Sequence, residues 1–143
     1  MDQSTANILR PILDDYVTAL NAVANGDSGP VKALCSQRDD ISQCGLWGGV
    51  EQGWPEVSAR WDWVAAQFVP GPDVVVTLEP SVSTVNGAVA YGVFIERWHA
   101  QYGAQTEPQD TMIRVTLIFR QEAGAWKAVH RHGDGLLTKT PPR

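Results

Sequence analysis

Residues 110–134 read DTMIRVTLIFRQEAGAWKAVHRHGD, two alternating runs joined by a short turn that contains Gly124. Because successive side chains of a strand point to opposite faces, this pattern predicts an antiparallel β-hairpin. One face of the first strand would carry Met112, Arg114, Thr116 and Ile118. One face of the second would carry Trp126, Ala128, His130 and His132. Polar groups on a largely buried sheet face are costly unless they are paired or line a cavity, so the hairpin is the predicted location of a functional site.

The rest of the chain predicts helices first and strands afterwards. Helical spacing of apolar residues and capping signals predict three helices, over residues 5–25, 28–35 and 55–68. Residues 39–53 predict a short strand and a glycine-rich turn. Strand patterns over 74–84 and 88–101 flank Asn86-Gly87, a strong hairpin signal. This order predicts an α+β domain, with three N-terminal helices packed on one face of a curved antiparallel sheet.

Composition and length restrict the class of protein. The chain has 143 residues, which is long enough for one domain spanning residues 1–143. The net charge of −5 and the lack of a Lys/Arg run disfavour nucleic acid as a partner. No apolar run reaches the length of about 18 residues that a membrane helix needs, and no secretion signal is visible. We therefore expect a cytoplasmic protein without a membrane partner.

The sequence does not predict a metal or a cofactor. Cys35 and Cys44 do not form a paired zinc motif, and we expect both to be reduced thiols. His130, His132 and Glu96 could in principle bind zinc, but Arg114 beside them would repel the metal. The glycine-rich segment lacks the lysine of a phosphate-binding loop and the spacing of a dinucleotide-binding motif.

Four segments carry a resemblance to a known superfamily. They are YVTALN at 16–21 followed by NGD at 25–27, GGVEQG at 48–53 with Val57 and Arg60, RVT at 114–116, and GAWK at 124–127 followed by HRH at 130–132. In this order they resemble the nuclear transport factor 2-like superfamily, and within it the SnoaL-like branch that includes ketosteroid isomerases. The resemblance covers nearly the whole chain. It implies a conical fold, a pocket between the concave sheet face and the helices, and a homodimer.

The resemblance does not extend to the steroid-isomerase chemistry. Those enzymes use a tyrosine on the first helix, an aspartate base and a second acid that helps to hold the enolate oxygen. Tyr16 matches the tyrosine, whereas the base position falls at or near Cys44 and the second acid falls near Thr116. Because both departures remove the needed groups, we do not predict steroid isomerisation.

A polar row across the sheet is the alternative site. A symmetric hairpin around residue 105 would place Glu96 opposite Arg114, and a turn centred near Ala123 would place Thr116 opposite His130 and Arg114 opposite His132. In the functional interpretation, Arg114 binds a substrate carbonyl or carboxylate and a histidine moves a proton. In the structural interpretation, the same groups form a buried network that fixes the strand register.

These observations give two hypotheses of function. The first is a small-molecule enzyme that performs cofactor-independent acid–base chemistry on a hydrophobic carbonyl compound, in an apolar pocket lined by some of the six tryptophans. The second is a non-catalytic ligand-binding or assembly domain. The candidate catalytic residues are His130, His132 and Glu96, and the candidate substrate-binding residues are Tyr16, Arg114, Thr116, Cys44 and Trp63.

The predicted homodimer would use the outer sheet face. If the polar row faces the pocket, the alternating apolar side chains point outward and need cover. These side chains are Val115, Leu117, Phe119, Tyr91, Val93 and Ile95.

Overall fold

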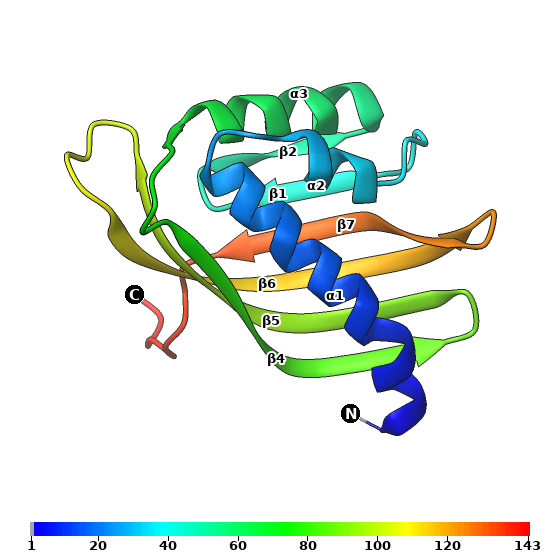
Figure 1. Cartoon of the computed structure of the whole chain (residues 1–143). Helices are drawn as coiled ribbons and strands as arrows, with labels where there is room; N and C mark the ends of the chain where they lie inside the picture. Colours follow the sequence, from blue (N-terminus) through cyan, green and yellow to red (C-terminus); the bar gives the residue numbers. More distant parts are fainter. Residues whose placement is uncertain (1) are drawn as a thin grey trace.

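Three helices and a long curled sheet make up the fold (Figure 1). The computed structural model describes residues 2–143. The helices are α1 (Gln3–Ala24), α2 (Gly29–Leu34) and α3 (Trp54–Ala66). The strands are β1 (Ser42–Gly45), β2 (Gly48–Gln52), β3 (Phe68–Val69), β4 (Val75–Asn86), β5 (Val89–Tyr102), β6 (Gln109–Glu122) and β7 (Ala125–Asp134). The predicted α+β class is confirmed, although β1 and β2 form a hairpin between the second and third helices.

The sheet is antiparallel at all but one strand pair. Its order is β2-β1-β7-β6-β5-β3, and β4 also pairs with β5. The exception is β1, which runs parallel to β7. The sheet curls around α1, which crosses its concave face diagonally; α3 lies next to β2, and α2 packs against α1 (Figure 1). No helix within residues 2–143 is long and apolar enough to span a membrane.

Helix α1 covers the concave face because its apolar residues recur with helical spacing. Leu9, Leu13, Tyr16, Leu20 and Val23 are all buried. The helix begins at Gln3, earlier than predicted, with the Asp2 carboxylate accepting the Thr5 N–H at 2.8 Å. Pro11 lies inside the helix rather than at its start. Its position on the exposed side lets water replace the hydrogen bond that a proline cannot donate.

The hairpin of β4 and β5 forms where the sequence predicts it. Asn86 pairs with Val89, and Gly87 adopts the positive φ of +62° that this tight turn requires. The register of β4 shifts between Pro80 and Val82, so the proline lies directly beside an irregularity at Ser81.

The predicted pairing of Glu96 with Arg114 is wrong by one residue. In the structure Glu96 lies opposite Ile113, and Arg114 lies opposite Ile95. Because side chains alternate along a strand, a shift of one residue moves the whole strand face to the other side of the sheet. Glu96 therefore points into the core with 0% exposure, whereas Arg114 points outward.

The predicted pairing of the last hairpin is also wrong, but it keeps the correct face. Thr116 lies opposite His132 and Ile118 opposite His130. The register shifts between Ile118 and Phe119, where a bulge contributes to moving the β7 partner of Thr116 farther from the turn than predicted. Arg114 consequently pairs with Asp134 rather than with a histidine.

The inner face of β6 is apolar, which corrects the predicted dimer surface. Val115, Leu117 and Phe119 point into the core and are almost completely buried. Tyr91, in contrast, points outward as predicted and is 41% exposed. The outer face thus combines the predicted side chains of β5 with both polar and apolar side chains of β6, Arg114, Thr116 and Ile118 among them.

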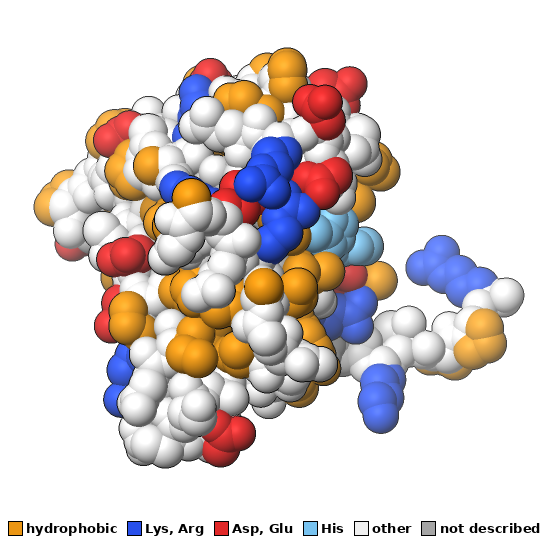
Figure 2. Space-filling model, turned by 90° about the vertical axis from the view of Figure 1, so that its right-hand side faces the viewer, with side chains coloured by type: hydrophobic (Ala, Val, Ile, Leu, Met, Phe, Trp, Pro, Cys, Tyr) orange, Lys and Arg blue, Asp and Glu red, His pale blue; other side chains and the backbone are white. Residues whose placement is uncertain are grey.

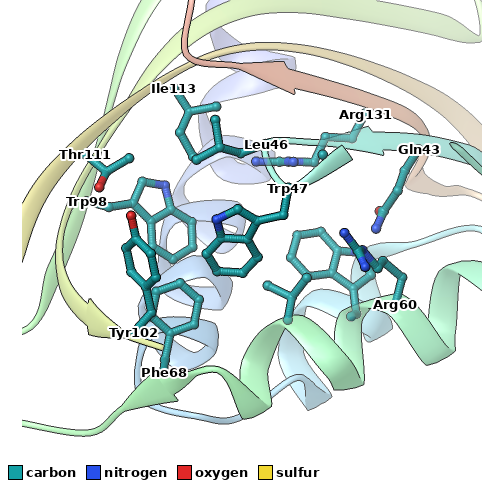
Figure 3. Close-up of a pocket in the computed structure, with 13 residues that line it drawn as sticks. Gln43, Leu46, Trp47, Arg60, Phe68, Trp98, Tyr102, Thr111, Ile113 and Arg131 are labelled. Carbon is teal, nitrogen blue, oxygen red and sulfur yellow. The ribbon is translucent and has the colours of Figure 1, made fainter. Parts of the chain in front are cut away.

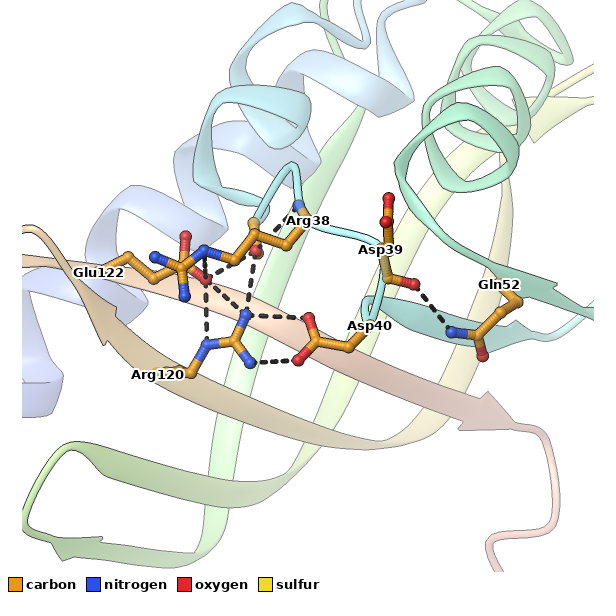
Figure 4. Close-up of polar contacts among 7 residues, drawn as sticks. Arg38, Asp39, Asp40, Gln52, Arg120 and Glu122 are labelled. Atoms are coloured by element: carbon orange, nitrogen blue, oxygen red, sulfur yellow. Dashed lines mark hydrogen bonds and ion pairs between the residues drawn. The ribbon is translucent and has the colours of Figure 1, made fainter.

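A charged cluster holds the turn of β6 and β7 to the loop before β1 (Figure 4). Arg120 contacts Asp40 at 2.6 Å and Glu122 at 2.7 Å, and Ser36 donates to Glu122 at 2.7 Å. Charged side chains and a histidine surround an apolar area on this end of the molecule (Figure 2). The cluster connects the end of β6 to the loop before β1. It lies at one end of the sheet, and the β1–β2 turn lies at the other end (Figure 1).

Candidate functional site

A cleft of about 590 Å³, its open mouth included, lies between the concave sheet face, α3 and the β1–β2 turn (Figure 3). Its walls combine aromatic and aliphatic side chains with a few polar groups. The lining consists of Gln43, Gly45, Leu46, Trp47, Arg60, Trp61, Val64, Phe68, Trp98, Tyr102, Thr111, Ile113 and Arg131.

Aromatic rings pack against one another around the mouth of the cleft. Phe68 stacks on Trp98 with ring centroids 5.3 Å apart, and Tyr102 lies 5.8 Å from Phe68. Trp47, carried by the β1–β2 turn, reaches across to Tyr102 at 5.1 Å (Figure 3). Such rings offer flat apolar surfaces, so the cleft suits a planar apolar ligand.

The inner end of the cleft is closed by a buried polar network. Arg131 donates from Nη2 to Glu96 Oε1 at 2.9 Å and from Nε to the Tyr16 oxygen at 3.0 Å. Tyr16 in turn donates its hydroxyl proton to Glu96 Oε2 at 2.5 Å, and the Trp98 indole donates to Glu96 Oε1 at 3.0 Å. Both carboxylate oxygens of Glu96 are thus occupied by donors, and the ion pair with Arg131 is buried.

Burial and neighbouring charges together set the pKa values of Tyr16 and Arg131, the two titratable partners of Glu96. Burial raises the pKa of Tyr16 well above its ordinary value, and Glu96 adds to the effect while Arg131 opposes it. Burial by itself would lower the pKa of Arg131, but Glu96 and Tyr16 outweigh it and raise that pKa above its ordinary value. Tyr16 is therefore a neutral phenol and Arg131 a permanent cation at every physiological pH.

Gln43 is one of the polar side chains of the lining that make no side-chain hydrogen bond within residues 2–143, as are Tyr102 and Thr111. Gln43 comes from β1, is only 4% exposed, and its amide makes no hydrogen bond to any other side chain or backbone group within residues 2–143. The amide can both donate and accept, so it is available to a ligand with either kind of polar group.

Arg60 fixes the β1–β2 hairpin to α3. Its Nε lies 3.1 Å from Glu51 Oε1, its Nη2 donates to the Gly48 carbonyl at 3.3 Å, and its guanidinium lies 4.3 Å from the ring centre of Trp63. The positive charge of Arg60 is therefore balanced by Glu51, as that of Arg131 is by Glu96. Each of the two arginines that line the cleft is therefore paired with a carboxylate that lies outside the lining.

The structure brings together two of the residues predicted for the site, Tyr16 and Glu96. Both face inward, but their partners are Arg131 and Trp98, which the sequence analysis did not select. Arg131 lies between two histidines on β7. Once the histidines are placed outside, alternation requires Arg131 to point inward, and this signal was available in the sequence.

The other predicted residues do not line the cleft, so the proposed polar row is wrong as a geometric arrangement. The outer face of the sheet carries Arg114, Thr116, His130, His132 and Cys44. Arg114 is bound to Asp134 at 2.9 Å, and Ser42 is hydrogen-bonded to His130 at 2.8 Å. Trp63 lies on α3 outside the cleft, is 45% exposed and packs edge-on against Trp47 at 5.8 Å.

Burial and the neighbouring His132 lower the pKa of His130, so that its ring is neutral near pH 7.

Among residues 2–143, no three His, Cys, Asp or Glu side chains are grouped so that they could hold a metal ion.

Comparison with known proteins agrees with the geometry of the fold. The family model described as "SnoaL-like domain" matches residues 12–134. A nuclear transport factor 2-like superfamily protein from Salmonella enterica superposes with a TM-score of 0.79 at 20% identity, covering 96% of each chain. A ketosteroid isomerase-like protein from Erwinia carotovora atroseptica gives 0.74 at 15% identity, covering 96% of this chain and 100% of the other.

The association domain of C. elegans CaMKII is also similar. It has a TM-score of 0.71 at 15% identity, covering 93% of this chain and 99% of that domain. Among curated proteins, none matches this chain.

Proposed function

This chain belongs to the SnoaL-like domain family, and from that premise we propose that it binds a small, neutral, hydrophobic carbonyl compound in the aromatic-lined cleft. The observation that carries the proposal is the Gln43 amide, which lines an otherwise largely apolar cleft and makes no side-chain hydrogen bond within residues 2–143. A ligand carbonyl could accept from this amide while its apolar body packs on the rings.

The charge balance of the cleft supports a neutral ligand. Arg131 is neutralised by Glu96 and Arg60 by Glu51, so a ligand anion would not meet an unpaired cation. A quaternary ammonium, which often binds between aromatic rings, would instead meet two guanidinium groups. A carbonyl or hydroxyl group fits the available donors without adding a charge.

The geometry supports binding more strongly than acid–base catalysis. A general base must have a free lone pair within reach of the substrate. Glu96 does not line the cleft, and its oxygens already accept from Tyr16, Trp98 and Arg131. The predicted alternatives, His130 and His132, are on the outer face. The lining thus offers polar groups that hold a ligand rather than one that removes a proton.

Three ligands of similar ring size test the proposal: acetophenone, benzoate and benzyltrimethylammonium. Saturation-transfer NMR at millimolar ligand concentration should show acetophenone bound more tightly than either ion. Gln43→Leu should weaken acetophenone binding about tenfold, because it removes one hydrogen bond while keeping the volume. Thr116→Val on the outer face is the matched control and should have no effect. Equal binding of all three ligands, or no binding of acetophenone, would refute the proposal.

We also propose a homodimer formed through the outer sheet face. Val82 pairs with Val93 and Ile118 with Tyr91, and Ile95 extends this apolar band along β5. Val82 and Tyr91 are both exposed, and an exposed band of this kind needs cover. The structural similarity to an association domain also supports assembly. Light scattering should give twice the chain mass, and Tyr91→Glu should give the single mass; a wild-type monomer at micromolar concentration would contradict this.

A further inference from the structure

The ring of Trp47 lies in the mouth of the cleft, among the other aromatic side chains. Its centroid is 5.1 Å from that of Tyr102, 5.8 Å from that of Phe68 and 5.8 Å from that of Trp63. Figure 3 shows the ring projecting from the β1–β2 turn toward the middle of the lining residues. A flat ring of the chain itself thus occupies a position in which an aromatic ligand would pack against the same neighbours.

The other rings at the mouth are held more firmly than Trp47. Trp98 is 6% exposed and donates its indole N–H to Glu96 Oε1 at 3.0 Å. Phe68 and Tyr102 lie opposite each other on the paired strands β3 and β5. Trp47, in contrast, is 36% exposed and does not belong to the hydrophobic core. It is therefore the loosely held ring of the group.

The backbone around Trp47 leaves room for its side chain to turn outward. Leu46 and Trp47 form a two-residue turn between Gly45 and Gly48, next to β2, which is an edge strand of the sheet. A Cβ added to Gly45 or to Gly48 would meet no atom within 4 Å, so the space around the turn is open. A change of the Trp47 rotamer can thus carry the ring from the cleft into solvent.

The hairpin that carries the turn is itself held in place. Arg60 donates to the Gly48 carbonyl at 3.3 Å and lies 3.1 Å from Glu51 Oε1. Leu46, the other residue of the turn, packs against the core. We therefore expect the movement to be a rotation of the Trp47 side chain and not a displacement of the hairpin.

We propose that Trp47 is a built-in competitor of the ligand, which must leave the mouth before the ring of the ligand enters. This inference rests on the proposed function and adds the regulation of the same cleft. In the closed form the Trp47 ring packs on Phe68 and Tyr102. In the bound form the aryl ring of the ketone packs on those two side chains, its carbonyl points toward Gln43, and Trp47 is turned into solvent.

Competition of this kind determines the sign of a change in affinity. When only a fraction of the molecules is open, the apparent dissociation constant is the intrinsic constant divided by that fraction. A minor conformer is commonly populated at about 0.1–10%, so removal of the competitor should tighten binding about tenfold or more. If Trp47 were a wall that packs on the ligand, its removal would weaken binding. The two roles therefore predict opposite effects.

Acetophenone affinities of three variants test this sign. Trp47→Ala should bind acetophenone about tenfold more tightly than wild type, and Trp47→Phe, which keeps a smaller ring, should lie between the two. Val64→Ala, at a half-buried wall position of the cleft, is the matched control and should weaken binding because it only removes contact surface. Circular dichroism checks that each variant is folded.

The indole N–H signals of the tryptophans give a second readout. Each of the six tryptophans contributes one such signal to a proton–nitrogen NMR spectrum, and the signal of Trp47 is the one missing from Trp47→Phe. A soluble paramagnetic agent weakens the signals of groups that are exposed to water. Acetophenone should make the Trp47 signal more sensitive to the agent, because the ring turns outward, and the Trp98 signal no more sensitive. This readout uses wild type and Trp47→Phe, so it decides the question even if Trp47→Ala does not fold.

The outcomes separate this inference from the proposed function. If wild type binds acetophenone and folded Trp47→Ala binds it equally or more weakly, Trp47 is a wall and this inference is overturned, whereas the proposed function stands. The same holds if acetophenone protects the Trp47 signal from the paramagnetic agent. If neither wild type nor Trp47→Ala binds acetophenone, the proposed function and this inference both fail.

Discussion

Replacing Arg131 with methionine should lower the free energy of unfolding by about 3–5 kcal/mol, because it leaves a buried carboxylate without its cation. Glu96 is 0% exposed, so water cannot replace the lost charge. Tyr16 would also lose the donor that bonds to its oxygen at 3.0 Å. Methionine preserves most of the apolar length of the side chain, so the expected loss comes from the charge and not from a large cavity.

An exposed ion pair on the same sheet gives the matched control. Arg114 contacts Asp134 at 2.9 Å, but half of its side chain is exposed, and such pairs contribute about 0–1 kcal/mol. Arg114→Met should therefore have little effect on stability. For a chain of this size, each kcal/mol corresponds to roughly 2–4 °C in melting temperature. Arg131→Met should consequently melt about 6–20 °C lower than wild type, against at most about 4 °C for Arg114→Met.

Urea denaturation followed by tryptophan fluorescence and circular dichroism measures both effects. A third variant, Arg131→Met combined with Glu96→Gln, removes the stranded charge while keeping an acceptor for Tyr16 and Trp98. It should be more stable than Arg131→Met alone. The reasoning is refuted if Arg131→Met costs less than about 1 kcal/mol, if Arg114→Met costs as much, or if the double variant shows no recovery.

Three further predictions concern separate parts of the molecule. Gly92→Ala should destabilise the protein by about 1–3 kcal/mol in the same urea assay, because its Cβ would lie 2.1 Å from the buried Phe94 ring, whereas Gly45→Ala, with nothing within 4 Å, should be neutral. Thiol titration at pH 8 should find one reactive cysteine in the native protein and two after unfolding, since burial raises the pKa of Cys35 to about 12; two fast thiols in the native state would contradict this. Burial and a neighbouring histidine lower the pKa of His130 below 6.5, so the unfolded chain binds the proton more readily, and stability should fall as pH drops below about 6.5. His130→Gln should remove that part of the pH dependence, and an unchanged profile would argue against it.

The sequence predicted the elements of the fold because their signals are local. Helical spacing in α1 and the Asn86-Gly87 turn each involve residues close together in the chain. The parallel pairing of β1 with β7 joins Cys44 to His132, and such a distant pairing has no local signal. The two-residue strand β3 was likewise missed, since it is defined only by its pairing with Tyr102.

The site could not be predicted because its geometry depends on whether the loop between β5 and β6 has an odd or an even number of residues. Gln109 lies opposite Ala100, so the loop between β5 and β6 is one residue away from the symmetric arrangement that the prediction assumed. That single residue exchanged the inner and outer faces of β5 relative to β6. The hydrophobic effect would have given the correct choice for β6, because burying a Val, Leu or Phe side chain contributes about 1.5–3 kcal/mol. The prediction instead gave more weight to grouping polar side chains.

Even the correct register would not have paired Arg131 with Glu96. Arg131 on β7 lies opposite Leu117 of β6, whereas Glu96 on β5 lies opposite Ile113 of β6. Arg131 and Glu96 are therefore on opposite sides of β6 and at different positions along it. Cross-strand reasoning considers direct and diagonal neighbours, and this pair is neither. The contact forms because the sheet curls and because Gly133 leaves space beside the guanidinium: a Cβ there would lie 3.3 Å from Arg131 Nη1 and 3.0 Å from Ile113. The sequence does contain one usable clue, since Glu96 alternates with Phe94 and Trp98 on an otherwise apolar face. A carboxylate in that position requires a buried cation, and a long arginine side chain on the inward face of another strand can supply it.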